Sequence, residues 1–252
     1  MAGPDSTGGG LIQQGVPRRP QIIAIGGGGN SAAAPDRRLD QYLLAQTGRV
    51  NPRICFLPTA TGDAETYIQR FYTSFATHRC QPTHVPLFGR TPNLGEVLLS
   101  QDLIYVGGGN TKSMLAVWRE WDLPQLLHLA WRRGIVLAGV SAGAICWFDR
   151  CVTDSWAESL KPLDGLGWLA GTCCPHYDGE PDRRPTLHAL VSAALVPAAL
   201  ALDDGAAAHF VGRKLARVVA FRPGARAYRV TRTRTGVTET ALPARQLRGV
   251  AR

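Results

Sequence analysis

The sequence lacks the features by which membrane-spanning, disulfide-rich and zinc-binding proteins are usually recognised. None of its apolar stretches approaches the roughly 20 residues that a membrane-spanning helix needs. Its six cysteines form no C-x-x-C pair and show no metal-ligand spacing with histidine. We therefore expect free thiols, no bound metal and no membrane partner. A reducing, cytoplasmic location fits this cysteine usage best.

Signals for nucleotide or nucleic-acid binding are equally sparse. Two glycine-rich segments, residues 26–30 and 107–110, complete neither the dinucleotide pattern G-x-G-x-x-G nor a phosphate loop with its lysine. The formal net charge of +9 comes from arginines that are scattered singly or in short pairs. Such scatter is more typical of a generally basic surface than of a nucleic-acid interface. We expect neither an organic cofactor nor a nucleic-acid partner.

The chain shows no internal repeat and no linker between domains. Residues 1–19 are rich in Gly, Pro and Gln and lack the apolar core of a secretory signal, so we expect a disordered tail there. The remaining residues, 20–252, are predicted to form a single α/β domain.

Short apolar runs alternate with amphipathic stretches along most of the chain. Predicted strands cover residues 21–25, 53–57, 83–87, 103–106, 134–138 and 169–174, and predicted helices cover residues 36–47, 64–77, 111–121 and 124–133. This alternation is typical of a mostly parallel sheet with helices on both faces. Two later runs, residues 216–221 and 227–230, flank Arg-Pro-Gly and predict a C-terminal β-hairpin.

The most informative motif is Gly-Val-Ser-Ala-Gly at residues 139–143, which places Ser141 between a buried strand and a helix start. Small residues on both sides allow a sharp turn that exposes the serine hydroxyl above the sheet. The backbone amide that follows, at Ala142, can then donate to a developing oxyanion. The motif therefore indicates acyl-transfer chemistry with Ser141 as nucleophile.

A serine nucleophile needs a base and an orienting carboxylate. His176 is the best base candidate, because it follows a predicted strand and a rigid proline. We favour Asp154 as the carboxylate, since it lies on the segment that leaves the elbow helix. Residue spacing leaves other acids open: Asp149, Glu158, Asp178 and Glu180. Asp154 is equally compatible with a turn or a helix cap.

The glycine segment at residues 107–110 also ends a predicted strand. It could supply a second oxyanion amide, because glycine lets the backbone approach a reacting carbonyl closely. A plain strand-to-helix turn would explain the same residues. Active sites of parallel sheets form at the carboxyl ends of the strands. Four segments of this chain fall at such ends: residues 26–30, residues 58–62, residues 107–110 and Ser141.

Three motifs, taken together and in this order, resemble the peptidase E family, serine peptidase family S51. They are Gly-Gly-Gly-Asn-Thr at 107–111, Ser-Ala-Gly-Ala at 141–144 and Cys-Pro-His-Tyr at 174–177. This family contains α-aspartyl dipeptidases and is related to cyanophycinase, on a fold like that of class I glutamine amidotransferases. The resemblance implies that Ser141 is the nucleophile, His176 the base and Asp154 the acid. It also implies that the amides of Gly108 and Ala142 form the oxyanion hole.

The resemblance further implies a small-peptide substrate, with dipeptides that carry an N-terminal aspartate as the leading class. Family dipeptidases bind that aspartate through an arginine shortly after the catalytic histidine, which points to Arg183 or Arg184, with Asn110 as another substrate-binding residue. A cyanophycinase or β-aspartyl peptidase, an α/β-hydrolase esterase and a non-catalytic small-molecule binder are the alternatives. A homodimer is left open.

Overall fold

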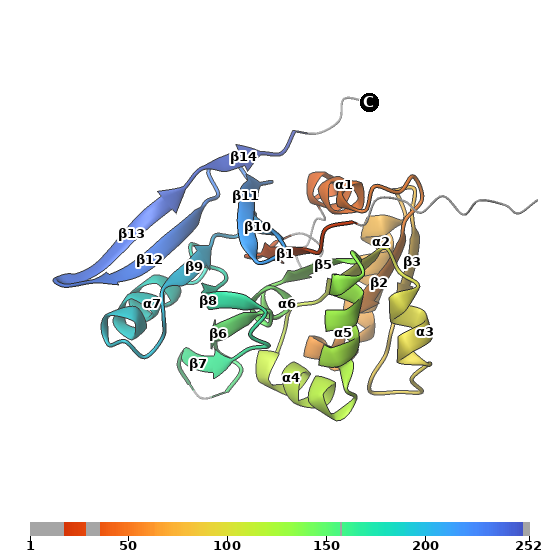
Figure 1. Cartoon of the computed structure of the whole chain (residues 1–252), viewed down its shortest axis with the longest axis horizontal. Helices are drawn as coiled ribbons and strands as arrows, with labels where there is room; N and C mark the ends of the chain where they lie inside the picture. Colours follow the sequence, from red (N-terminus) through yellow and green to blue (C-terminus); the bar gives the residue numbers. More distant parts are fainter. Residues whose placement is uncertain (1–17, 29–35, 157, 249–252) are drawn as a thin grey trace, which may run out of the picture.

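Two β-sheets organise the computed structural model, which describes residues 18–28, 36–156 and 158–248 (Figure 1). The first sheet has the order β14 (Ala244–Gln246), β11 (Lys214–Ala220), β10 (Ala206–Val211), β1 (Gln21–Ile25), β5 (Val136–Val140), β4 (Leu103–Val106), β2 (Arg53–Leu57) and β3 (Gln81–His84). The second has the order β13 (Gly236–Leu242), β12 (Ala227–Thr233), β9 (Ala199–Leu202), β8 (Leu169–Cys174), β6 (Phe148–Thr153) and β7 (Lys161–Asp164).

The first sheet is parallel from β1 to β3, and both of its faces are covered. Alternate residues of each strand point to opposite faces, which explains why these strands are apolar throughout. On one face α1 (Arg37–Gln46) and α2 (Glu65–Phe75) pack, whereas α3 (Leu94–Leu99), α4 (Thr111–Glu120), α5 (Leu123–Arg132) and α6 (Ala142–Ile145) cover the other. The α/β class and the mostly parallel character of this sheet are confirmed.

The expectation of one sheet is wrong, because the chain after α6 builds the second sheet. Its strands β6, β8 and β9 are parallel to one another, and α7 (Arg183–Ser192) packs against the sheet beside β12. The predicted hairpin is also assigned to the wrong strands. The run at 216–221 falls largely in β11, which pairs with β10, whereas β12 pairs with β9 and β13. The turn at Pro223 thus carries the chain from one sheet to the other, and the C-terminal hairpin is β12–β13.

The helix boundaries follow from capping. Asp36 accepts a hydrogen bond from the amide of Arg38 at the start of α1, and Asn110 accepts one from the amide of Ser113 at the start of α4. The predicted helices at 36–47, 64–77, 111–121 and 124–133 therefore exist, each with ends shifted by no more than two residues. Helices α3 and α7 were not predicted.

A cluster of tryptophans joins the two sheets on the face that carries α4 and α5. The rings of Trp147 and Trp168 stack at a centroid distance of 5.3 Å, and Trp131 stacks on Trp168 at 6.1 Å. Trp118 of α4 reaches the same cluster at 6.2 Å from Trp147. These side chains are at most 9% exposed, so their burial fixes the second sheet against the first.

All six cysteines are free, as expected. Of the expected tail, residues 1–17 lie outside the described residues, and Arg18 already contacts Asp102 at 3.6 Å. Among the described residues no helix is long and apolar enough to cross a membrane. The single-domain boundaries and the likeness to class I glutamine amidotransferases stay predictions.

One carboxyl group is buried between α1 and α2 without a full set of partners. Asp40 is 1% exposed; Ser74 donates to its Oδ2, and its Oδ1 has no hydrogen-bond partner among the described residues. Burial raises the pKa of Asp40 to about 6. The neighbouring His78 lies 3.7 Å away and is no permanent counter-charge, because burial lowers its pKa.

We expect Asp40→Asn to stabilise the protein at neutral pH. Between the ordinary pKa of 3.8 and the folded value of about 6, the unfolded chain loses a proton that the folded chain retains. The contribution of Asp40 to stability is therefore present below 3.8 and lost as the pH rises to about 6. Urea unfolding should show a gain of about 1–3 kcal/mol at neutral pH that vanishes in acid. The exposed control Glu158→Gln should change little; equal stability of Asp40→Asn and wild type at neutral pH would contradict the prediction.

Candidate active site

Ser141 occupies the sharp turn between β5 and α6. Its backbone angles, φ 54° and ψ −112°, are unusual for a residue with a side chain. The flanking glycines make the turn possible, since a Cβ on Gly139 would lie 2.1 Å from the carbonyl oxygen of Gly143. A Cβ on Gly143 would lie 2.4 Å from the carbonyl oxygen of Val106. The predicted elbow and its reliance on small residues are therefore visible in the backbone.

His176 approaches Ser141 from the second sheet. It follows β8 and Pro175, with φ 51°, and its amide donates to the carbonyl oxygen of Gly26 at the end of β1. Its Nε2 lies 2.8 Å from Ser141 Oγ. The structure thus brings the predicted nucleophile and base into hydrogen-bond contact across the boundary between the sheets.

The carboxylate beside His176 belongs to Asp204, which follows β9. Its Oδ1 lies 2.7 Å from His176 Nδ1. The hydrogen bond from His176 holds the pKa of Asp204 below its ordinary value, so this carboxylate is ionised at neutral pH. An ionised acceptor at Nδ1 requires a proton on that nitrogen, which leaves Nε2 free to accept the proton of Ser141.

Two glycines leave room for the Asp204 carboxylate. A Cβ on Gly27 would lie 1.8 Å from Asp204 Oδ1 and 2.6 Å from His176 Nδ1. A Cβ on Gly179 would lie 2.3 Å from Asp204 Oδ2. Any side chain at either position would displace the carboxylate, so these glycines determine how closely the acid approaches the imidazole.

A second carboxylate and an arginine hold the Asp204 backbone. Asp178 Oδ1 accepts from the Asp204 amide at 2.8 Å, and Asp178 Oδ2 accepts from Arg222. The Arg222 Nε in turn donates to the Asp204 carbonyl oxygen at 2.8 Å. Asp178, an open alternative for the acid, therefore supports the backbone of Asp204 instead of contacting His176.

Asp154 does not reach the imidazole, and the sequence-based choice of acid is corrected here. Its side chain is 67% exposed and lies 3.7 Å from Arg183 Nη2. The reason is that the loop after β6 docks on α4: Ser155 Oγ accepts from the Thr111 amide at 2.8 Å, and Asn110 Nδ2 donates to the Ser155 carbonyl oxygen at 2.8 Å. These contacts hold Asp154 away from His176.

The topology explains why residue spacing could not identify the acid. Strand β8, which delivers His176, lies between β6 and β9, and the three are parallel. An acid after either neighbour could flank the histidine, and Asp154 follows β6 while Asp204 follows β9. The apolar run at Ala199–Leu202 followed by Asp-Asp-Gly was the available signal for a strand-end acid.

The proposed oxyanion amides lie next to the nucleophile. A Cβ on Gly108 would lie 3.2 Å from Ser141 Cβ, so the backbone at the end of β4 borders the serine. Ala142 is the first residue of α6, where the helix itself provides no acceptor for the amide. Both positions are compatible with donation to a carbonyl oxygen attacked by Ser141.

The three residues predicted to bind substrate have other contacts. Asn110 caps α4 and binds Ser155. Arg183 is 3% exposed, and its guanidinium donates to Glu180 at 2.7 Å and to the Val152 carbonyl oxygen at 3.0 Å. A buried guanidinium with these partners is held as a structural contact.

Arg184 differs from Arg183 in being 47% exposed. Its guanidinium carbon lies 4.8 Å from the centre of the Tyr177 ring and 5.2 Å from that of Tyr228. Its Nη2 lies 3.4 Å from Glu239. Arg184 thus adjoins the residue after His176 and keeps part of its surface open. In the part of the chain that the structure describes, no group of three or more His, Cys, Asp or Glu side chains is arranged to hold a metal ion.

The chain is similar to known proteins that are named as peptidases. The chain is 51% identical over 228 residues to the "Uncharacterized peptidase YgaJ" of Bacillus subtilis (strain 168), covering 90% of this chain and 99% of that one. A crystal structure of a peptidase from an acI-B1 Actinobacterium matches with a TM-score of 0.68 at 17% identity, over 90% of this chain and 96% of the other.

A protein from Listeria monocytogenes EGD-e, provisionally named a peptidase E, matches with a TM-score of 0.58 at 17% identity, over 89% of this chain and 100% of the other. At such low identity these structural matches show the fold alone. The profile of peptidase family S51 matches residues 22–218. The chain therefore belongs to peptidase family S51, a family of serine peptidases, and is a peptidase.

Proposed function

We propose that the protein hydrolyses small peptides through an acyl-enzyme formed at Ser141. The observation that carries this proposal is the continuous hydrogen-bond chain from Ser141 Oγ through both ring nitrogens of His176 to Asp204, with distances of 2.8 and 2.7 Å. A nucleophile, a base and an orienting acid in this arrangement are what serine hydrolysis requires.

Acylation follows from the positions of the protons. As Ser141 Oγ attacks the scissile carbonyl carbon, its proton passes to His176 Nε2. The carboxylate of Asp204 stabilises the imidazolium that forms, because it accepts from Nδ1 throughout. The negative charge on the former carbonyl oxygen is met by the amides of Gly108 and Ala142. His176 then gives its proton to the leaving amine, and the peptide bond breaks.

Deacylation uses the same groups. Water attacks the ester carbonyl carbon while His176 Nε2 accepts its proton, and the proton returns to Ser141 Oγ as the ester bond breaks. The products are a carboxylate and the regenerated enzyme. The side chains that move or stabilise the protons, those of Ser141, His176 and Asp204, already lie in hydrogen-bond range of one another.

A preference for N-terminal aspartate stays a prediction from the family resemblance. Of the two candidate arginines, only Arg184 has an exposed guanidinium, since Arg183 is enclosed by its own partners. The substrate carboxylate would have to compete with Glu239 for Arg184. We therefore propose Arg184, stacked on Tyr177, as the residue that would recognise an acidic substrate.

Substitution of the two candidate acids tests the triad. We expect Asp204→Asn to reduce kcat by about 10³- to 10⁴-fold, because the imidazole loses the acceptor that fixes its tautomer. The matched variant Asp154→Asn should stay within about twofold, since the Asp154 side chain is 67% exposed, lies 3.7 Å from Arg183 and does not contact His176. Fluorophosphonate labelling should occur in wild type and disappear in Ser141→Ala. Unlabelled wild type would indicate a non-catalytic binder, and a larger loss in Asp154→Asn would reject Asp204 as the acid.

Gly27 provides a test of the space around the acid. We expect Gly27→Ala to lower kcat/KM by about 10²-fold or more, because its Cβ would overlap Asp204 Oδ1 and His176 Nδ1. Gly89→Ala is the matched control, since a Cβ there meets no atom within 4 Å. Near wild-type turnover by Gly27→Ala would contradict the proposed position of the Asp204 carboxylate beside His176.

A dipeptide panel tests the substrate class. Asp-X, isoAsp-X and Ala-X peptides should be compared by product release in wild type and Arg184→Gln. If Arg184 recognises the acidic side chain, Arg184→Gln should lower kcat/KM for Asp-X by about 10-fold or more and leave Ala-X unchanged. Preferred cleavage of isoAsp-X would favour a β-aspartyl or cyanophycinase type, and no turnover of any Asp-X peptide would remove the dipeptidase assignment.

A further inference from the structure

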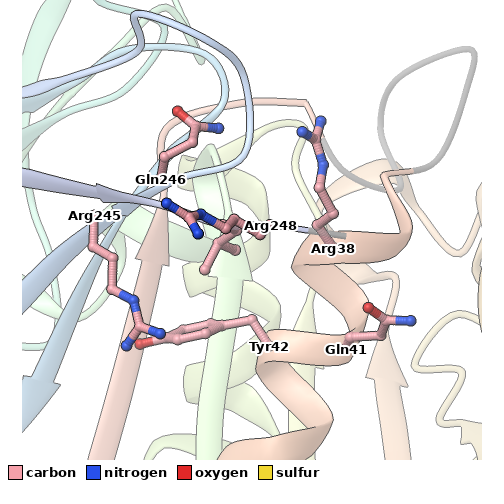
Figure 2. A pocket seen from close by; sticks show the side chains of 7 residues that line it. Arg38, Gln41, Tyr42, Arg245, Gln246 and Arg248 are labelled. Atoms are coloured by element: carbon pink, nitrogen blue, oxygen red, sulfur yellow. The ribbon is translucent and has the colours of Figure 1, made fainter. Parts of the chain in front are cut away.

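A cavity of about 510 Å³ lies between α1 and the end of β14, and no residue that lines it belongs to the triad (Figure 2). One wall is formed by Arg38, Gln41 and Tyr42 of α1, and the other by residues 245–248. Helix α1 and residues 245–248, which are far apart in the sequence, therefore line the same cavity. Its volume falls in the range of about 300–1,000 Å³ that is usual for small-molecule sites.

The lining is positively charged, and none of its residues that the structure describes carries a carboxylate. Arg38 is already paired, because both oxygens of Asp36 accept from its guanidinium, at 3.0 and 2.6 Å. Arg245 and Arg248 are exposed, and neither guanidinium forms a hydrogen bond or an ion pair with any residue that the structure describes. The cavity is thus lined by two guanidinium groups, those of Arg245 and Arg248, whose N–H donors have no partner among the residues that the structure describes.

The remaining lining residues add neutral donors and an apolar wall. Gln41 and Gln246 carry amide groups, and the Tyr42 ring and Leu247 supply apolar surface. The Tyr42 hydroxyl is engaged by His209 Nδ1 at 2.6 Å, and burial raises the pKa of Tyr42 to about 12. Tyr42 therefore stays uncharged, and nothing in the lining offsets Arg245 and Arg248.

We propose that this cavity binds a small organic molecule that carries two or more oxyanionic groups, of phosphate or carboxylate type. A guanidinium group can form two parallel hydrogen bonds to a phosphate or to a carboxylate. The two unpaired guanidinium groups therefore match a ligand with two oxyanionic groups. An anionic guest would also relieve the repulsion between arginines that surround one space. A cavity of this size suits a small molecule, whereas nucleic acid requires an extended basic stripe. The inference is independent of the chemistry at Ser141.

Isothermal titration calorimetry with the full chain tests this proposal, with pyrophosphate and citrate as probes at low and at physiological ionic strength. We expect saturable one-site binding of at least one probe, and the tighter probe identifies the phosphate or the carboxylate class. Arg245→Ala/Arg248→Ala should weaken binding about 100-fold, since two charge-assisted contacts are lost. Gln41→Glu retains every arginine and should weaken binding about 10-fold by placing a carboxylate in the cavity.

The matched control is Arg132→Ala/Arg133→Ala, which removes two exposed arginines at the end of α5 and lowers the net charge equally. It should bind the probes as wild type does, and all variants should keep their melting temperature and the fluorophosphonate labelling of Ser141. Absence of binding by both probes would overturn the proposal. So would an equal loss of affinity in the control, because binding would then follow the overall charge of the protein.

Discussion

The arrangement of the active site depends on backbone hydrogen bonds at the end of β1. The carbonyl oxygen of Gly26 accepts from the His176 amide, and that of Gly27 accepts from the Gly205 amide. These two bonds attach the loops that carry the proposed base and the proposed acid, both from the second sheet, to the strand beside β5. Ser141 is attached to the same strand, since its amide donates to the Ile25 carbonyl oxygen at 3.0 Å. One strand end thus positions all three side chains.

This attachment explains why unfavourable local geometry persists at the site. Ser141 and His176 both have positive φ angles, which cost free energy for residues with side chains. Each is held by bonds on either side: the Ser141 carbonyl oxygen accepts from two amides of α6, and the Tyr177 amide donates to the Leu202 carbonyl oxygen. The close contacts at three glycines belong to the same arrangement: Gly139 and Gly143 let one backbone segment approach another, and Gly27 leaves room for the Asp204 and His176 side chains.

Local signals predicted much of the fold and pointed to two of the three residues in the hydrogen-bond chain, Ser141 and His176. The apolar strands and capped helices of the first sheet were predicted because burial on both faces and capping are properties of short segments. Ser141 and His176 were predicted for a related reason, since both follow predicted strands: Ser141 lies in a glycine-flanked turn, and His176 follows a proline. The second sheet was missed, because its order depends on pairing between segments that lie far apart in the sequence.

The sequence by itself indicated Ser141 and His176 as the proposed nucleophile and base, together with the strand ends where they lie, because glycines that permit a sharp turn and a proline that fixes the backbone are local features. Only the tertiary structure indicated the proposed acid. Asp154 and Asp204 follow strands on opposite sides of β8, and the docking of Ser155 on α4 removes the former. Tertiary packing likewise buries Arg183 and leaves Arg184 exposed, although the two are adjacent in the chain. Which of two equivalent side chains reaches a site depends on contacts that residue spacing does not encode.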